Sequence, residues 1–376
     1  MTYDVLVAGA RCAGASTAML LARAGLRVLV VDPLPAGRDT LSTHALMRGA
    51  VLQLHRWGLL DRIRRAGTPA LTTTVFDYGD EVVSIPLKAK DGVDALIAPR
   101  RTVLDPILED AAAEAGATIL RGWSVVDVLR DGTGSVVGAR LGGPEGSRDV
   151  AARWVVGADG VRSRVARSVG APTLRSARHT TASVYGYWKG IPREENRWTF
   201  RPRVGLGTIP TNGGDTCVFV SVRPEVFQAG RRLGLESFLL DQVEKADPEL
   251  RAFLVPEARS GDLRAFAGAE GFLRRPWCRG WALVGDAGYF RDPLTAHGIT
   301  DAFRDAELLA AALVEGSDDA LAGYQEERDA AAEGLMAVTD RIASLEWTME
   351  EVKALHHRLS KEMNAAMEPL KRRLAA

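Results

Sequence analysis

The sequence predicts a mixed α/β protein, α+β in part, that ends in a helical region. Three observations indicate this. A strand, a turn, a helix and a second strand open the chain, aromatic-rich strand-like segments fill residues 172–275, and helical patterns dominate from Thr300 onward. At 376 residues the chain exceeds what one hydrophobic core usually supports, so we expect two interlocked domains.

The opening segment reads as a βαβ unit. Residues 5–8 form a short apolar strand ending in glycine, and residues 16–24 form a helix of small residues and leucine stopped by Gly25. Residues 27–31 form a second buried strand, which Asp32 ends. This order within about 30 residues is typical of a Rossmann-like dinucleotide-binding fold. The alternative is an unrelated α/β start, as in nucleotidyl-sugar or kinase domains.

Loops, helices and short strands follow. We expect, in order, an irregular loop at 34–48, a helix at 49–65, antiparallel strands within 72–87, a helix at 101–115, strands at 124–129 and 136–141, and a buried strand at 154–156. Gly116 is the expected C-terminal cap of the helix before it. The run DGTG at 131–134 is the turn signal between the two strands that flank it.

The second half changes character twice. Strand-like segments at 183–189, 198–203, 205–210 and 216–223 predict a mostly antiparallel sheet, and residues 281–284 return to a buried parallel strand. A helix interrupted near residues 316–317 follows. The last region, 321–376, reads as one or two amphipathic helices with Trp347, Met349, Met363 and Met367 on the apolar side. These helices are expected to pack on the body of the protein; a substrate lid or a dimer contact is the alternative.

Composition excludes several classes of protein. The 48 Lys and Arg residues balance 48 Asp and Glu residues, which argues against nucleic acid or an anionic membrane as partner. The cysteines Cys12, Cys217 and Cys278 form no C-x-x-C pair, so neither a metal site nor a disulfide framework is expected, and a cytoplasmic location is the simplest setting. We expect no N-terminal targeting signal and no transmembrane segment.

The first candidate site is the turn of residues 9–14, Gly9, Ala10, Arg11, Cys12, Ala13 and Gly14, which has the spacing of G-x-G-x-x-G. Such a turn sets a pyrophosphate against a helix N-terminus. Arg11 replaces the middle glycine. Arginine fits if its φ stays negative, and its guanidinium could then reach a phosphate.

Asp32 stands at the end of the second strand, just before Pro33, where a carboxylate accepts hydrogen bonds from ribose hydroxyls. An acidic group there disfavours a 2′-phosphate, so the site suits FAD or NAD. An aspartate that merely caps the turn before Pro33 is the alternative.

Two later segments favour FAD. The run GADGVRSR at 157–164 resembles the G-A-D-G-x-x-S segment of flavoprotein aromatic hydroxylases. The runs GDAG at 285–288, DP at 292–293 and AHGI at 296–299 resemble their G-D-A-x(n)-P-x(2)-G-x-G segment. With the glycine turn in family order, the chain resembles the para-hydroxybenzoate-hydroxylase-like superfamily of group A flavoprotein monooxygenases, which also includes halogenases and geranylgeranyl-reductase-like enzymes.

The resemblance implies a set of FAD-contacting residues. Asp286 follows a buried strand and can accept hydrogen bonds from ribityl hydroxyls, while the amides around residues 296–299 face the pyrimidine edge of the flavin. Beyond the glycine turn, Asp32 and Pro33, the expected contacts are Arg38, Arg101, Val125, Asp159, Gly285, Asp286, Pro293, Ala296, Gly298 and Ile299. For Arg38 and Arg101 a plain surface role is the alternative.

Other residues have open roles. His297 stands where the family often has glutamine, and His44 is expected near the flavin, as a proton donor, a substrate contact or a structural histidine. Some of the aromatic residues Tyr185, Tyr187, Trp188, Trp198, Phe200 and Phe219 should line a substrate cavity and others belong to the core. No catalytic residue is identified.

The resemblance implies an FAD-binding domain built from residues 1–75, 95–170 and 276–320, with a substrate-binding β-sheet domain at 76–94 and 171–275. The expected activity is an NAD(P)H-dependent monooxygenase that hydroxylates or epoxidises an aromatic or polycyclic small molecule through a flavin C4a-hydroperoxide, as a monomer or homodimer. Rival readings are an FAD-dependent reductase of alkenes or prenyl chains and a non-catalytic flavin-binding protein. A halogenase is disfavoured because the chain has no W-x-W-x-I-P motif.

Overall fold

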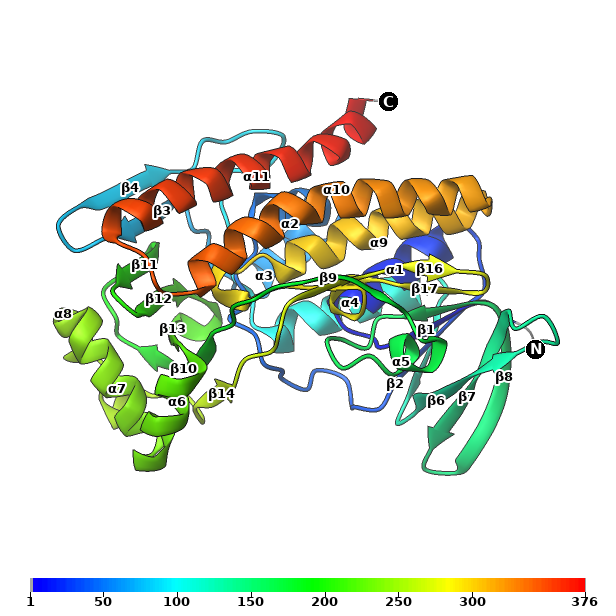
Figure 1. Ribbon diagram of the computed structural model, residues 1–376, viewed down its shortest axis with the longest axis horizontal. Helices are drawn as coiled ribbons and strands as arrows, with labels where there is room; N and C mark the ends of the chain where they lie inside the picture. Colours follow the sequence, from blue (N-terminus) through cyan, green and yellow to red (C-terminus); the bar gives the residue numbers. More distant parts are fainter. Residues whose placement is uncertain (1–2, 376) are drawn as a thin grey trace.

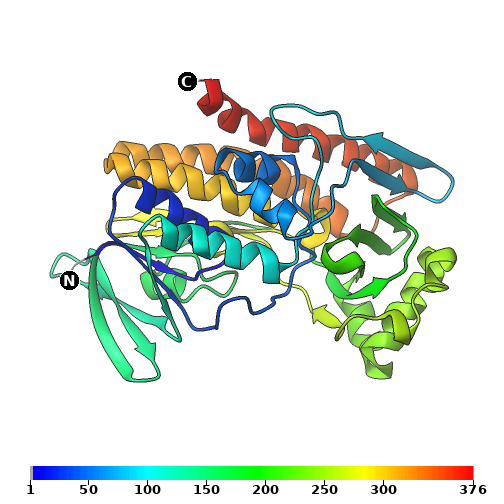
Figure 2. The same ribbon diagram turned by 180° about the vertical axis from the view of Figure 1, so that it is seen from behind.

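The computed structural model describes residues 3–375, with side chains for residues 3–368. Figure 1 shows two large β-sheets side by side, with the C-terminal helices running along one side of the molecule from one sheet to the other. The reverse view in Figure 2 shows the same arrangement from behind. Each of the two large sheets has hydrophobic clusters of its own, one on each face.

The first sheet is mostly parallel and has the strand order β16-β17-β8-β1-β2-β5, with β7 and β6 attached to β8. Its strands are β1 (Tyr3–Ala8), β2 (Val28–Asp32), β5 (Thr118–Arg121), β6 (Ser124–Arg130), β7 (Val136–Gly143), β8 (Gly146–Gly157), β16 (Trp277–Cys278) and β17 (Trp281–Leu283). Successive side chains of β1 enter two different cores, Val5 and Val7 on one face and Leu6 and Ala8 on the other. Both faces are therefore covered, and the expected Rossmann-like α/β architecture is confirmed.

Helices cover this sheet. On one face lie α1 (Cys12–Arg23), α4 (Arg101–Glu114) and α9 (Gly298–Glu315), with α2 (Arg48–Arg56) and α3 (Leu60–Arg65) outside them, while α5 (Arg164–Val169) packs on the other face. The single helix expected at 49–65 is wrong. It is two helices, because Gly58 adopts a φ of 76° and turns the chain between them.

The second sheet has the strand order β14-β10-β13-β12-β11-β3-β4. Its strands are β3 (Thr73–Asp77), β4 (Val82–Pro86), β10 (Ala182–Lys189), β11 (Asn196–Arg201), β12 (Val204–Pro210), β13 (Asp215–Val222) and β14 (Arg264–Phe266). All neighbours pair antiparallel except β11 and β3, which are parallel. The expectation of a mostly antiparallel second sheet is confirmed.

The two faces of this sheet differ in what they bury. Tyr185, Tyr187 and Phe219 face the C-terminal helices, whereas Trp188 and Val220 face α6 (Pro224–Gly230), α7 (Leu235–Ala246) and α8 (Pro248–Arg251). A small third sheet joins β9 (Thr173–Ser176), β15 (Phe272–Arg274) and β18 (Tyr289–Phe290). Short 3-10 turns lie at η1 (Asn212–Gly214), η2 (Arg231–Leu233), η3 (Pro256–Ala258), η4 (Gly285–Ala287) and η5 (Pro293–Thr295).

The chain ends in two long helices, α10 (Asp318–Ala343) and α11 (Met349–Ala375). The expected interruption after α9 is confirmed, because Gly316 caps α9 with a φ of 76° and Ser317 accepts a hydrogen bond from the Ala320 amide. Trp347 and Val352 are buried against the second sheet, and Met367 is buried in the core of the first. Within residues 3–375, the helices are all too short or too polar to cross a membrane.

Candidate active site

The glycine turn depends on close packing. Gly9 has a φ of 104°, and a Cβ there would lie 2.5 Å from the Ala158 carbonyl oxygen. A Cβ on Gly14 would lie 1.9 Å from the carbonyl oxygen of Gly9. Both positions therefore require glycine, and the turn meets the segment that begins at residue 157. Arg11 has a φ of −89°, so arginine fits its position without strain.

The N-terminus of α1 is arranged to receive an anion. Among the described residues no side chain caps it, and its first turn holds no acidic residue. Its free amides and its dipole therefore suit a diphosphate. Arg11 Nη1 donates to Thr40 Oγ1 at 2.6 Å, which holds the guanidinium near the loop that follows β2.

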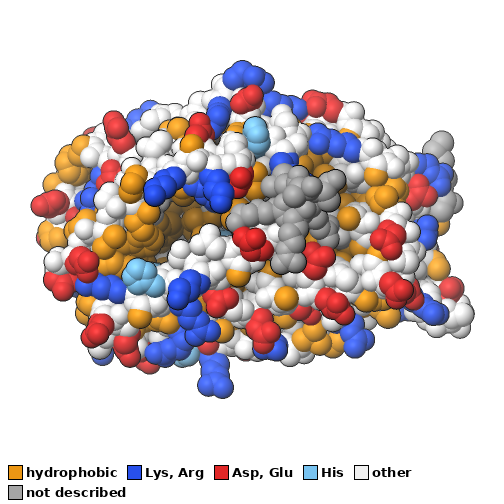
Figure 3. Space-filling view, turned by 90° about the horizontal axis from the view of Figure 1, so that it is seen from above, with side chains coloured by type: hydrophobic (Ala, Val, Ile, Leu, Met, Phe, Trp, Pro, Cys, Tyr) orange, Lys and Arg blue, Asp and Glu red, His pale blue; other side chains and the backbone are white. Residues whose placement is uncertain are grey.

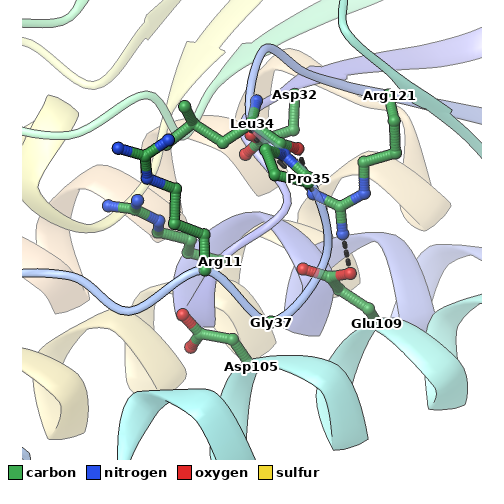
Figure 4. Close-up of a pocket in the computed structure, with 9 residues that line it drawn as sticks. Arg11, Asp32, Leu34, Pro35, Gly37, Asp105, Glu109 and Arg121 are labelled. Carbon is green, nitrogen blue, oxygen red and sulfur yellow. Dashed lines mark hydrogen bonds and ion pairs between the residues drawn. The ribbon is translucent and has the colours of Figure 1, made fainter.

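Asp32 links the turn to this loop. Its Oδ2 accepts from the Ala10 amide at 2.9 Å and its Oδ1 from the Leu34 amide at 2.8 Å. Each oxygen keeps a second lone pair, so the carboxylate can shape the turn and still accept a ribose hydroxyl. Arg121 Nη1 lies 3.8 Å from Asp32 Oδ1, and Arg121 Nη2 pairs with Glu109. Figure 4 shows Glu109 and Arg121 pointing toward one another in the pocket.

The pocket of Figure 4 is lined mostly by polar atoms. It is lined by Arg11, Asp32, Leu34, Pro35, Gly37, Arg38, Asp105, Glu109 and Arg121. Glu109 and Arg121 were absent from the sequence prediction. In the sequence they are charged residues among apolar ones, in or near the predicted helix 101–115. That pattern does not predict that they form an ion pair with one another.

Arg101 forms a buried ion pair on α4. Its Nε lies 2.8 Å from Asp105 Oδ1 and its Nη2 lies 2.9 Å from Asp105 Oδ2. Cys12 Sγ lies 3.4 Å from the same carboxylate, and burial raises the pKa of this thiol. Since the pair uses Nε and Nη2, the Nη1 of Arg101 stays available to a ligand.

Asp286 of η4 offers a carboxylate that can accept hydrogen bonds from a ligand. Burial, together with the nearby Asp301, raises its pKa to about 6, against the effect of Arg101. Its carboxylate accepts no hydrogen bond from any residue between 3 and 368. A Cβ on Gly298 would lie 4.0 Å from its Oδ1, and one on Gly285 would lie 2.8 Å from Ala13. A half-buried acid without a donor, set between α1 and α9, fits the hydroxyls of a ribityl chain.

The segment after β18 presents the N-terminus of α9. Asp292 accepts from the Thr181 hydroxyl at 2.9 Å and from the Leu294 amide at 3.0 Å, which ties η5 to the second sheet. Ala296 has a φ of 50°. The Asp301 amide makes the first backbone bond of α9 to the His297 carbonyl. The amides of Gly298 and Ile299 therefore have no acceptor within the helix.

A buried charge network supports this turn. His297 Nδ1 lies 3.3 Å from Asp301 Oδ1, Arg291 Nη2 lies 2.8 Å from Oδ2, and Arg304 Nη1 lies 2.9 Å from Oδ1. Burial opposes ionisation, yet the Arg291 and Arg304 guanidiniums hold the pKa of Asp301 below its usual range. Burial lowers the pKa of His297, so its imidazole is neutral at neutral pH.

The sequence model of the family described as "FAD binding domain" matches residues 2–339. The chain belongs to this FAD-binding family. The prediction of an FAD-dependent oxidoreductase is therefore confirmed, and the protein is a flavoprotein enzyme.

Two curated relatives align over most of the flavoprotein. It is 29% identical to aklavinone 12-hydroxylase RdmE of Streptomyces purpurascens, over 89% of this chain and 67% of that one. It is 30% identical to menaquinone reductase of Mycolicibacterium smegmatis, over 83% of this chain and 76% of that one. The structure of p-nitrophenol 4-monooxygenase PnpA of Pseudomonas putida superposes with a TM-score of 0.80 at 19% identity, covering 98% of this chain and 95% of that one, so it shows the shared fold.

The remaining predicted FAD contacts lie in different settings. Arg38 lines the pocket with Arg11, and Pro33 leads into it. The Asp159 carboxylate accepts from the Ser163 hydroxyl and from the amides of Arg164 and Val165, so it caps α5. Val125 is buried in the core cluster on the face of the sheet opposite α1. The flavoprotein places these two side chains outside the pocket of Figure 4.

Proposed function

We propose that the protein is an NAD(P)H-dependent monooxygenase that inserts one oxygen atom of O2 into an aromatic or polycyclic small molecule. One observation carries the proposal. The aromatic face of the second sheet, Tyr185, Tyr187, Trp198, Phe200 and Phe219, shares one buried cluster with Leu294 of η5. A flat apolar substrate on that face would lie beside the segment 292–299, which is expected to hold the flavin. The family and the hydroxylase RdmE support this reading.

The residues present fit FAD. The α1 N-terminus and Arg11 would hold the diphosphate, Asp32 the ribose, and Asp286 the ribityl chain. The amides of Gly298 and Ile299 would face the pyrimidine edge. Held by these residues, FAD would supply the two-electron redox chemistry that links NAD(P)H to O2. The aromatic face of the second sheet would keep water away from the reacting groups. On this proposal, the first sheet belongs to the FAD-binding domain and the second sheet to the substrate-binding domain.

A second candidate is a flavin-dependent reductase, favoured by the 30% identity to menaquinone reductase. The two reactions differ in where oxygen goes. With 18O2, NADPH and a panel of phenols, naphthols and quinones, a monooxygenase transfers one labelled atom to the product. A reductase consumes NADPH without label in the product.

Flavin identity gives an independent test. The purified protein should be yellow and should release FAD on denaturation, because a diphosphate turn and a ribose acceptor have no purpose for FMN. Release of FMN, or of a nicotinamide without flavin, would overturn the proposed function.

A further inference from the structure

The last helix lies over the aromatic face of the second sheet. In Figures 1 and 2, α11 crosses β3 and β4. Partly exposed apolar side chains of these three elements border the buried cluster: Phe76, Val83, Met349, Leu355 and Leu359. Figure 3 looks onto this side of the molecule and shows a hollow with a hydrophobic floor. An apolar opening thus lies on the side that α11 crosses.

His356 of α11 lies among aromatic rings of this face. Its ring centroid is 4.3 Å from that of Phe200, 5.5 Å from that of Phe76 and 5.8 Å from that of Tyr78. The Tyr78 hydroxyl lies 2.8 Å from His356 Nδ1. Burial lowers the pKa of His356 to about 4, so the ring is neutral at neutral pH. Its Nε2 makes no hydrogen bond with any residue in the range 3–368.

Close contacts connect this imidazole to the expected flavin segment. Phe200 pairs with Gly205 across β11 and β12. A Cβ on Gly205 would lie 3.0 Å from Leu294 Cδ1 and 4.0 Å from Phe200 Cε1. Leu294 belongs to η5, within the segment 292–299 that is expected to hold the flavin. The Phe200 ring therefore lies between His356 and this segment.

The helix is held in place on both sides of His356. Lys353 Nζ lies 2.8 Å from Glu81 Oε2 and 5.4 Å from the centre of the Tyr78 ring, which fastens α11 to the turn between β3 and β4. Farther along, Met367 packs near Gly49, where a Cβ would lie 3.6 Å from its Cγ. His356 is therefore presented from a fixed element rather than from a loose end.

We propose that His356 is a specificity-determining residue, whose free Nε2 hydrogen-bonds a hydroxyl or carbonyl group of a fused-ring aromatic substrate lying against Phe200. The inference rests on the proposed function, because it takes the aromatic face as the substrate site. The neutral imidazole can form a hydrogen bond with either a hydroxyl or a carbonyl group. When the Tyr78 hydroxyl donates to Nδ1, Nε2–H donates to a carbonyl; when Tyr78 accepts from Nδ1–H, Nε2 accepts from a hydroxyl.

The test compares two ligands that differ in one hydroxyl group, 1-naphthol and naphthalene, on the FAD-bound protein. Binding is followed by the change in the visible flavin spectrum and by equilibrium dialysis. The wild type should prefer 1-naphthol by about 3- to 10-fold, the range of one neutral hydrogen bond. His356→Phe should remove this preference and keep the affinity for naphthalene. His356→Gln, which keeps a donor and an acceptor, should retain part of it.

The neighbouring His357 provides the matched control, because it lies on the same helix and is exposed. His357→Phe should leave both affinities unchanged. A wild type that binds neither ligand or shows no preference would overturn the inference, and so would a preference that survives in His356→Phe. If the preference depends on His356 but 18O never enters any product, the proposed function fails and the binding role stands.

Discussion

The Tyr187 hydroxyl donates to His44 Nε2 across 3.0 Å, and His44 Nδ1 lies 3.1 Å from the carbonyl oxygen of Ala98. Because a carbonyl only accepts, Nδ1 carries the proton and Nε2 accepts from Tyr187. His44 has a φ of 48° and is buried. The structure thus favours the structural reading of this histidine, which ties the loop after β2 to the second sheet.

Tyr187→Phe should therefore destabilise the protein. The change leaves His44 Nε2 buried without its donor, and such a loss costs about 1–3 kcal/mol. The free energy of unfolding in urea measures it. Tyr3→Phe, at a half-buried position on β1, serves as control and should change little. Equal stability of the two variants would contradict the role given to this hydrogen bond.

The same histidine predicts a loss of stability in acid. Burial, reinforced by the nearby Arg100, lowers the pKa of His44 to about 3 from its ordinary 6.5. The unfolded chain takes up the proton first, so stability falls as pH drops from about 6.5 toward 3, by about 2 kcal/mol at pH 5. His44→Gln should lose less stability over this interval. The test is the midpoint of urea unfolding at pH 7 and at pH 5 for the wild type and for His44→Gln. Equal losses of stability in the two proteins would contradict the lowered pKa of His44.

Asp286→Ala should weaken FAD binding by about 10-fold or more, since a charged acceptor of ribityl hydroxyls contributes about 1.5–3 kcal/mol. The raised pKa of Asp286, about 6, adds a pH dependence. Its carboxylate ionises as pH rises from 5 to 7, so FAD should bind the apoprotein more tightly over that interval. Asp286→Asn should bind with no such trend. Fluorescence titration of the apoproteins with FAD provides the measurement.

Arg11→Gly should weaken FAD binding about 10-fold or more if the guanidinium contacts the diphosphate, because a charged hydrogen bond is lost. The guanidinium of Arg11 can still contact a phosphate, because in the structure it donates only to the neutral hydroxyl of Thr40. Relief of backbone strain cannot offset the loss, because arginine already sits there with a negative φ. Titration with FAD at two salt concentrations tests it, and dissociation constants equal to those of the wild type would reject the phosphate contact.

Asp159→Ala should lower the free energy of unfolding more than it lowers the FAD content. Its carboxylate meets the amides at the start of α5, and losing such a cap costs about 0.5–2 kcal/mol. Because three donors of the same segment already occupy the carboxylate, FAD content should fall less than stability. Asp159→Asn, which can still cap, should recover most of the stability. A variant that loses FAD while its unfolding free energy stays unchanged would contradict this ordering.

The local sequence alone determined the βαβ start, the two glycines of the turn and the breaks in the chain. These follow from short-range physics: Gly9 and Gly316 adopt left-handed φ values that side chains disfavour, and apolar periodicity marks buried elements. Gly58 carries the same signal within the predicted helix 49–65, where its positive φ turns the chain between α2 and α3.

The tertiary structure alone decided which distant residues meet. Alternation marks Tyr187 and Trp188 equally as strand residues. Only the packing of the C-terminal helices against one face and of α7 against the other distinguishes the face proposed to bind substrate from the opposite one. Likewise, Arg121 reaches Asp32 and Glu109 because β5 lies beside β2, and His356 reaches Phe200 because α11 folds back over β11. Local propensity acts over a few residues, whereas these contacts arise from sheet order and helix packing across the whole chain.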